Sequence, residues 1–368
     1  MKKTIALILA LCLCVCLAAC GQSAAPAAPA ATEAPAAPAA TEAPAATEAP
    51  AAPEEQPEVT IRIAHQSTEN TEIHLGLAKL AELLEAAGVN FKVEMFPNKQ
   101  LVASDPDAIE AVELGEIDVT SVAEMQFATT CQAFYVFNAN YLFDGVDDAE
   151  ATLSPTGELG AALRKAVIDG NYGCQVGTFF GGSPRGFFTT KKQVTLPSDM
   201  AGLKIRSADN PINIAELEAL GCSTVIIAGG ELYTAFQQGA ADGYISAITS
   251  HVNSGWLDVA PYCVDTLQTI YIPTILVNTA KLESMTEVQR AAFDKAMEEA
   301  TAYEWNVMRD QLAGIFDQME ELQAQGKCTL TRLTDEQRAE WKAVMVPATE
   351  DMVKEKLGDY AYLLDYVR

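Results

Sequence analysis

The feature that most constrains the fold is a run of about 40 residues near the C-terminus that reads as one uninterrupted helix. Thr286 and Gln289 have the spacing of a capping box, and no proline follows before Pro347. Apolar residues then step by three and four up to Gly326, which ends the run. At ~1.5 Å per residue this helix is about 60 Å long, more than the width of one small domain. A helix over about 286–325 must therefore project from the protein or brace two domains.

Upstream of this helix, the sequence alternates twice between strand and helix patterns, over residues 59–122 and again over residues 173–247. Such alternation is typical of a parallel sheet covered by helices, so the sequence predicts two α/β units, although no sequence repeat relates them. A second capping box, Thr334 with Gln337, predicts a last helix that ends near Lys356. Strands are expected at 59–64, 90–96, 117–122, 173–180, 186–190, 202–207, 222–227 and 241–247.

The chain is strongly acidic. Its 368 residues carry a formal net charge of −26, and 49% of them are hydrophobic. This length and hydrophobic content suffice for two folded domains. Nucleic acids and anionic membranes are bound through basic patches, so the charge argues against both as partners.

The N-terminus has the pattern of a secretory signal over residues 1–19. Lys2 and Lys3 precede an apolar run at 4–19, and the sequence LAAC ends that run at Cys20. The LAAC ending resembles a bacterial lipoprotein box, which implies cleavage before Cys20 and a lipid on its thiol. An ordinary signal peptide and a single membrane helix are the alternatives, although the run is short for a membrane helix, which needs ~20 residues.

The segment after Cys20 has a composition that cannot form a core. Residues 21–57 are almost only Ala, Pro, Thr and Glu, and ATEAP recurs among them. Prolines keep such a chain extended. We expect residues 20–57 to be a lipidated cysteine and a tether, which anchors the folded part to the bacterial cell membrane outside the cytoplasm.

The cysteines outside the signal segment are five in number and far apart, with no CxxC motif. An odd count argues against a fully paired disulfide framework. We expect buried free thiols that pack as small apolar side chains. These residues are Cys131, Cys174, Cys222, Cys263 and Cys328.

Signatures of enzymes are missing from the sequence. It contains no GxSxG, HExxH, P-loop or GxGxxG motif, and its only histidines are His65, His74 and His251. No side chains have the spacing of a metal site, and no arrangement of a nucleophile with a histidine base stands out. We therefore expect a binding protein without catalytic residues, metal or cofactor. An enzyme of the cell envelope is the rival hypothesis.

Arg206 is the first candidate for a binding residue. It ends the predicted strand GLKIRS, and Asn210 and Pro211 then have the pattern of an N-cap and first turn of a helix. Ligands of open α/β sheets bind outside the carboxyl ends of strands, where Arg206 lies, and Arg185 precedes or begins another predicted strand. Both guanidinium groups could therefore face one cleft between two domains. The alternatives for Arg206 are a pair with Asp209 or a solvated charge.

At these residues the sequence resembles the DctP-type solute-binding proteins of the tripartite ATP-independent periplasmic (TRAP) transporters. The resemblance covers nearly everything from Val59 to about Val353, and the order and spacing of its stretches make it specific. These stretches are MFPNKQL (95–101), ELGEIDV (113–119), DMAGLKIRSADNP (199–211), LEALGCSTVII (217–227), GELYTAFQQGAADGY (230–244) and LVNTAKLESMTEVQRAAFDKAMEEA (276–300).

The resemblance implies a Venus-flytrap fold, in which two α/β lobes share a long helix, and no catalysis. We assign residues 58–182 plus about 273–305 to lobe I, and residues 183–272 plus about 306–368 to lobe II, with the helix bridging them. Members of the family capture a small organic acid and deliver it to permease subunits driven by an ion gradient. We expect a monomer. A receptor for a sensor, or for a solute that is not a carboxylate, is the alternative.

In this family the arginine of GLKxR forms a salt bridge with the ligand carboxylate, and here that residue is Arg206. A guanidinium presents two parallel donors that fit a carboxylate. Three of the further positions given below have alternatives to ligand binding. Asp105 could be a helix N-cap, Arg185 could be a surface charge, and Asp209 could only position its turn. The further ligand-binding positions that the resemblance implies are Arg185, Ser246, His65, Asp105, Glu124 and Asp209.

Two departures from the family pattern indicate a remodelled pocket. Ser246 stands in DGYIS where relatives often have an asparagine that contacts the ligand, and Tyr244 is a bulky neighbour. Gly229 stands where relatives often have a phenylalanine. Specificity for sialic acid or a simple C4-dicarboxylate is therefore not expected to carry over unchanged.

Overall fold

The computed structural model describes residues 56–207, 210–227 and 231–367. The predicted signal segment, Cys20 and most of the predicted tether lie outside these residues, as do Asp209 and Gly229. No helix in the described ranges combines the length and the apolar character needed to cross a bilayer.

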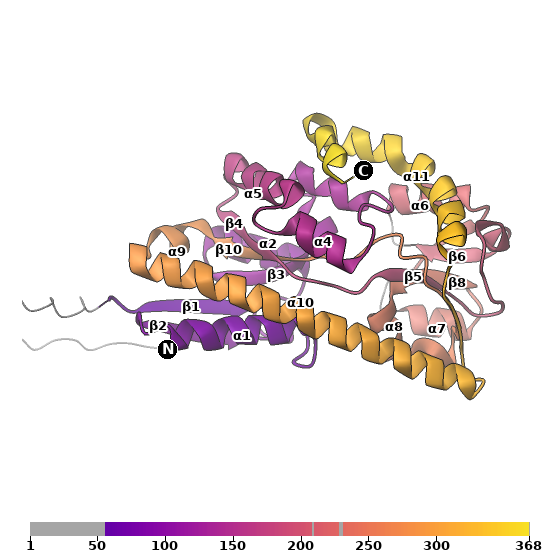
Figure 1. Ribbon diagram of the computed structural model, residues 1–368, viewed down its shortest axis with the longest axis horizontal. Helices are drawn as coiled ribbons and strands as arrows, with labels where there is room; N and C mark the ends of the chain where they lie inside the picture. Colours follow the sequence, from indigo (N-terminus) through magenta and orange to yellow (C-terminus); the bar gives the residue numbers. More distant parts are fainter. Residues whose placement is uncertain (1–55, 208–209, 228–230, 368) are drawn as a thin grey trace, which may run out of the picture. The chain divides into compact units, whose positions relative to one another are not determined.

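Strands and helices alternate through the first part of the described chain (Figure 1). They are β1 (Val59–Ala64), α1 (Glu72–Ala86), β2 (Phe91–Phe96), α2 (Asp105–Leu114), β3 (Val119–Ala123), α3 (Glu124–Phe127), the 3-10 helix η1 (Gln132–Asn138), α4 (Val146–Leu153), α5 (Glu158–Gly170), β4 (Cys174–Phe179) and β5 (Arg185–Thr189).

The second part repeats the alternation and then becomes helical. Its elements are η2 (Pro197–Met200), β6 (Lys204–Ser207), α6 (Pro211–Ala219), β7 (Ser223–Ile226), α7 (Leu232–Gln237), β8 (Gly243–Ala247), α8 (Ile248–Asn253), η4 (Trp256–Asp258), β9 (Tyr262–Val264), β10 (Pro273–Asn278), α9 (Thr279–Glu283), α10 (Glu287–Ala324), β11 (Thr329–Thr331), α11 (Asp335–Leu357) and η5 (Gly358–Tyr366).

The strands form two sheets, and each mixes parallel and antiparallel pairs. The order is β2-β1-β3-β10-β4 in the first sheet and β11-β9-β5-β8-β6-β7 in the second. β1 is parallel to β2 and β3, as the alternation predicts, but β10 is antiparallel to both β3 and β4. The predicted parallel pairing is therefore confirmed for β1, β2 and β3, and the antiparallel pairs of β10 were not predicted. The chain enters β10 on returning from the second sheet, so β10 runs against its neighbours.

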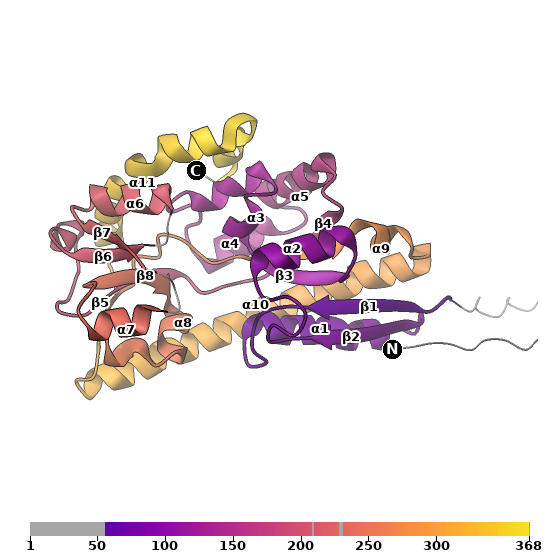
Figure 2. The ribbon, with the colours of Figure 1, turned by 180° about the vertical axis from the view of Figure 1, so that it is seen from behind.

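Helix α10 packs against elements of both sheets, as Figures 1 and 2 show. It has 38 residues, begins with the predicted capping box of Thr286 and Gln289, and continues through Gly314. Its first half contributes Met297 to the core cluster that includes Ile61 of β1. Its second half contributes Met319 to the cluster that includes Phe188 of β5. One helix thus supplies apolar side chains to the cores beneath both sheets, which confirms the long helix expected from the sequence.

The chain passes from the first sheet to the second through Gly181 and Gly182. Side chains from the middle of α10 hydrogen-bond to the backbone of this connection. The Glu304 carboxyl oxygen Oε2 accepts a hydrogen bond from the Gly181 backbone nitrogen at 2.7 Å. Trp305 Nε1 donates to the Phe179 carbonyl at 3.1 Å. A Cβ atom on Gly181 would lie 2.5 Å from the Trp305 ring, so only glycine fits. Burial raises the pKa of Glu304 well above its ordinary value.

The C-terminal part of the chain also packs against η1, which lies between β3 and β4 in the sequence. Helix α11 starts at the predicted capping box of Thr334 and Gln337. Its last turn and η5 place Leu357 and Leu363 in the same core cluster as Phe134 of η1. The division of the chain into lobes at the predicted boundaries stays a prediction.

The five cysteines in the described chain are all free and buried, as the sequence predicts. Four of them lie within core clusters, Cys131 and Cys174 in one, Cys222 in another and Cys263 in a third, and Cys328 is buried outside these clusters. Burial raises the pKa of the Cys131 and Cys328 thiols, which keeps them in the neutral form that packs as an apolar group.

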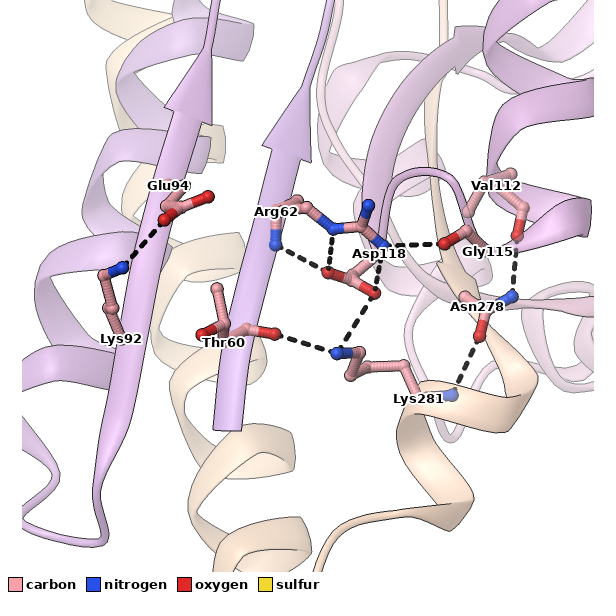
Figure 3. Close-up of polar contacts among 9 residues, drawn as sticks. All are labelled: Thr60, Arg62, Lys92, Glu94, Val112, Gly115, Asp118, Asn278 and Lys281. Atoms are coloured by element: carbon pink, nitrogen blue, oxygen red, sulfur yellow. Dashed lines mark hydrogen bonds and ion pairs between the residues drawn. The ribbon is translucent and has the colours of Figure 1, made fainter. Parts of the chain in front are cut away.

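A buried carboxylate ties the strands of the first sheet to α9 (Figure 3). Asp118 Oδ2 accepts hydrogen bonds from the Arg62 backbone nitrogen at 2.7 Å and from Arg62 Nε at 3.2 Å. Its other oxygen lies 3.4 Å from Lys281 Nζ, which also donates to the Thr60 carbonyl. Charged donors thus approach both oxygens, which offsets the cost of burying this charge.

Candidate ligand-binding cleft

A cavity of ≈ 450 Å³ lies between residues carried by the two sheets. Met125 and Gln126 reach it from α3, directly after β3 of the first sheet, and Tyr271 reaches it from the segment before β10. The second sheet contributes the side chains at the ends of β5, β6 and β8 and the first residues of α6. This volume lies within the range of about 300–1,000 Å³ typical of small-molecule sites.

Arg206 lines this cavity from the end of β6. Its Nε donates to the Ile227 carbonyl at 2.9 Å, which fixes the direction of the guanidinium. Its two terminal nitrogen atoms have no hydrogen bond or ion pair with the rest of the described chain. Burial lowers the pKa of Arg206, as expected for a positive charge that has lost water without gaining an acidic neighbour among the described residues.

Arg185 lines the same cavity from the start of β5, but it faces an acid. Its Nη2 lies 3.8 Å from Oε1 of Glu124, and its Nη1 lies 3.7 Å from the Met125 sulfur. Glu124 is completely buried, and its other oxygen accepts from the Ile272 backbone nitrogen at 3.3 Å. Burial raises the pKa of Glu124 to about 7, although Arg185 opposes that rise.

The first turn of α6 also faces the cavity. The Asn210 side chain accepts from the backbone nitrogens of Ile212 and Asn213, which confirms the predicted N-cap, with Pro211 in the first turn. Asn210 and Asn213 both line the cavity. The partial positive charge at the N-terminus of a helix favours an anion at this place.

Ser246 lines the cavity beside Arg185, because Ser246 pairs with Gly186 across β8 and β5. Tyr244 does not line it. That ring is buried in the core against Phe188, and its hydroxyl oxygen lies 2.7 Å from Nδ1 of His251. Tyr244 therefore does not narrow the pocket as a bulky neighbour.

His65 and Asp105 are not among the lining residues of the cavity. His65 is completely buried, with Nε2 at 3.2 Å from Nδ1 of His74, and burial together with His74 lowers the pKa of His65 to about 4. Asp105 accepts from Gln66 Nε2 at 2.5 Å, and burial raises the pKa of Asp105. The alternative role of Asp105 as a helix N-cap was wrong, because Ser104 caps α2.

The structure thus brings Arg206, Arg185 and Ser246 to one cavity, and places Glu124 in contact with Arg185 behind it. Asp209 lies outside the described residues, so its predicted role stays a prediction. Asn213 and Gln126 also line the cavity, and neither was predicted from the sequence. Two signals in the sequence could have indicated them. Asn213 is three residues after the predicted N-cap Asn210, on the same side of the helix, and Gln126 comes shortly after the carboxyl end of a predicted strand.

A second buried carboxyl, unforeseen from the sequence, lies on α6 next to the lining residue Leu217. Glu216 Oε2 accepts from Asn140 Nδ2 at 3.3 Å, and burial raises the pKa of Glu216 to about 7. Its electrostatic interaction with Arg185 opposes that rise. Arg185 therefore interacts with two acids of raised pKa, Glu124 and Glu216. Arg206 has no acidic neighbour among the described residues.

The chain matches one family of known proteins over most of its length. The sequence profile of the DctP family, described as bacterial extracellular solute-binding protein family 7, matches residues 63–356. The C4-dicarboxylate-binding periplasmic protein DctP of Rhodobacter capsulatus is 27% identical over 303 residues, which cover 82% of this chain and 88% of that protein.

Solved structures share the fold. A TRAP periplasmic solute-binding protein from Ochrobactrum anthropi, with its C-terminus bound in the ligand-binding pocket, has a TM-score of 0.77 at 24% identity, covering 84% of this chain and 96% of that one. Another, from a Sulfitobacter species with bound β-D-galacturonate, has a TM-score of 0.72 at 21% identity, covering 84% and 99%.

The predicted α/β fold class and the predicted family are therefore confirmed. The family profile spans most of the chain, and it includes both sheets and the cavity between them. The chain belongs to the DctP family, family 7 of the bacterial extracellular solute-binding proteins.

Proposed function

We propose that the cavity at Arg206 captures a small organic carboxylate, and that the protein acts by binding, without catalysis. The observation that carries this proposal is the isolation of the Arg206 guanidinium. It is half-buried in a cavity and pairs with no acid of the described chain. A buried positive charge without a counter-charge is costly, and a ligand carboxylate supplies the missing charge.

The geometry suits an anion that also carries polar groups. The free Nη1 and Nη2 atoms of Arg206 are two parallel donors, the arrangement that binds a carboxylate through both oxygens. Ser246 and Asn213 add a hydroxyl and an amide at the same cavity, and Arg185 adds a second cation that Glu124 partly offsets. These groups would hydrogen-bond the hydroxyl or second acid group of the ligand.

The relatives support this class of ligand. Their names include a C4-dicarboxylate-binding protein, and one solved structure holds a uronate, which is a sugar acid. We propose a dicarboxylate or sugar acid for this chain. Ser246 replaces an asparagine and is shorter, so the pocket accepts a ligand that is bulkier at this position.

We further propose that the protein delivers its ligand to the membrane subunits of a TRAP permease. The family is extracellular and its named relatives are periplasmic, which supports a place outside the cytoplasm. The lipoprotein-like LAAC sequence supports a lipid anchor on Cys20, with residues 21–57 as the tether. In this proposal the protein is a monomer, and its cleft closes on the ligand and opens to release it to the permease.

A screen of ligands tests the central claim. The thermal midpoint of the purified protein is measured with mono- and dicarboxylic acids, uronates, neutral sugars and amines, because a ligand selective for the folded state raises it. We expect only carboxylates to raise the midpoint, and titration calorimetry then gives their affinities. A rise with neutral sugars or amines alone would refute the carboxylate assignment.

A further inference from the structure

A second cavity, of ≈ 590 Å³, follows the outer edge of β4 on the opposite side of the first sheet from β2. We call it the β4 trough. One wall is α10, with lining residues from Arg290 to Trp305, which corresponds to about 22 Å of helix. The other wall consists of the end of α4 and of α5, and Figure 1 shows β4 between α5 and α10. None of the residues lining the ligand-binding cleft lines this trough.

The interior of the trough is mostly apolar. Phe179, Phe293 and Met297 line it, together with Leu153 and Trp305. Hydroxyl groups lie along it as well, since the oxygens of Thr178 and Thr301 are 2.9 Å apart and both residues line the trough. A long apolar channel with few polar groups is the usual chemistry of a small-molecule site.

Arg164 is the cation of this trough that has no acidic partner in the described part of the chain. Its Nη1 donates to the carbonyls of Leu153 and Ser154 at 3.1 and 3.3 Å, at the end of α4. Its guanidinium carbon lies 5.0 Å from the centre of the Phe179 ring. Its Nε and Nη2 atoms bond to no other group of the described chain, and burial lowers the pKa of Arg164 to about 10.

Arg290 is the other cation among the lining residues of the trough, and it is already paired. Arg290 Nε donates to both oxygens of Asp294, at 2.9 and 3.0 Å. Glu150 is bonded to Arg309 on α10. Within the described chain, Arg164 therefore retains an unneutralised charge with free donors facing a largely apolar channel.

We propose that the β4 trough binds a second ligand, a carboxylate with an extended apolar body. Its carboxylate takes the Nε and Nη2 donors of Arg164, and its apolar body lies along Phe293 and Met297 towards Leu282 at the far end. This site is separate from the cleft at Arg206 and does not depend on what the cleft binds.

The same observations argue against a peptide strand added to β4. The outer edge of β4 is already blocked at one end, because Trp305 Nε1 occupies the Phe179 carbonyl. The pairing of β4 with β10 is also irregular near Gly177, and such bulges discourage the addition of another strand. An extended small molecule needs none of the backbone groups of β4.

Calorimetry with dodecanoate, below the concentration at which it forms micelles, tests the proposal. The protein used is the Arg206→Met variant, so that a carboxylate cannot be held by that guanidinium in the cleft. We expect dodecanoate to bind this variant and dodecanol to bind at least tenfold more weakly, because the alcohol lacks the charge that Arg164 takes. Failure of dodecanoate to bind, or equal binding of the two, would overturn the proposal.

Further variants in the same background locate the site. Arg164→Met is expected to weaken dodecanoate binding about tenfold or more, and Arg290→Met, which removes a paired guanidinium at the other end, by less than threefold. Arg164→Met also removes the bonds to α4, so Ala302→Trp provides a second test. Ala302 is exposed and lines the trough, so a larger side chain fills the channel without disturbing the core. If neither Arg164→Met nor Ala302→Trp weakens binding, dodecanoate binds elsewhere and the proposal is wrong.

Discussion

The guanidinium of Arg185 approaches Glu124 to 3.8 Å at a point where the glutamate is completely buried. Burial outweighs the attraction of the cation, so the pKa of Glu124 rises from 4.5 to about 7. The folded protein therefore holds a proton at Glu124 that the unfolded chain has already lost between these values. The stability contributed by this proton is complete below about pH 4.5 and is lost as the pH rises towards 7.

Replacing Glu124 by Gln should remove this loss. We expect the free energy of unfolding of Glu124→Gln, relative to the wild type, to increase between pH 5 and pH 8, by up to the order of 3 kcal/mol. Urea titrations at several pH values measure the difference. The buried His65 affects stability in the opposite direction below pH 6.5, but it does so in both proteins and cancels. Glu340→Gln, at an exposed position, is the control for the lost charge. A difference that is the same at every pH would contradict the prediction.

Arg206 should dominate the affinity for the ligand of the cleft. For any carboxylate that the screen identifies, Arg206→Met is expected to raise Kd at least tenfold, because a charged hydrogen bond contributes ~1.5–3 kcal/mol. The Kd of Arg206→Lys should lie between those of the wild type and Arg206→Met, since an ammonium keeps the charge but cannot present two parallel donors. Lys204→Met removes an exposed charge from the same strand and should leave Kd within about twofold. Equal effects of the two methionine variants would show that only long-range charge matters.

The contact between α1 and the middle of α10 makes Gly76 sensitive to a single methyl group. A Cβ atom at Gly76 would lie 2.7 Å from both Glu304 Cγ and the Phe180 ring. We expect Gly76→Ala to destabilise the protein by about 1–3 kcal/mol, because the packed core cannot take up the added atom. Gly314→Ala, at an exposed position of α10 with open space around it, should instead stabilise the protein by about 0.5–1 kcal/mol. Chemical denaturation of both variants checks the opposite signs.

The ion pairs drawn in Figure 3 should differ widely in energy. Asp118→Asn removes the charge from a buried carboxylate that faces Arg62 and Lys281, and we expect a loss of roughly 2–3 kcal/mol. Glu94→Gln breaks the pair with Lys92 at 2.8 Å, but both side chains are exposed, so the loss should stay below about 0.5 kcal/mol. Comparable losses in the two unfolding titrations would contradict this ranking.

Features determined within a few residues of sequence were predictable. Both capping boxes, the N-cap at Asn210 and the length of α10 follow from local spacing, and the structure has all of them. The antiparallel position of β10 was not predictable in this way. It depends on contacts with β3 and β4, which are about 150 and 100 residues away in the chain.

Some candidate site residues line the cavity and others are buried in the protein, and their spacing in the sequence does not distinguish the two groups. Arg206 lies at the end of a strand and Glu124 directly follows one, yet Arg206 lines the cavity and Glu124 is completely buried. The difference lies in the direction of α3, which turns Met125 and Gln126 towards the cavity and Glu124 inwards. Arg164 gave no signal at all, because a single cation within an amphipathic helix is normally solvated.

The five buried thiols have a consequence for how the protein matures. No covalent bond between cysteines has to form before the described chain reaches its native packing, and none can be lost to a reductant. A reductant therefore leaves the stability of the described residues unchanged. The same fold can be reached in an oxygen-free medium or an aerated one, without an oxidoreductase or a disulfide isomerase to assist it.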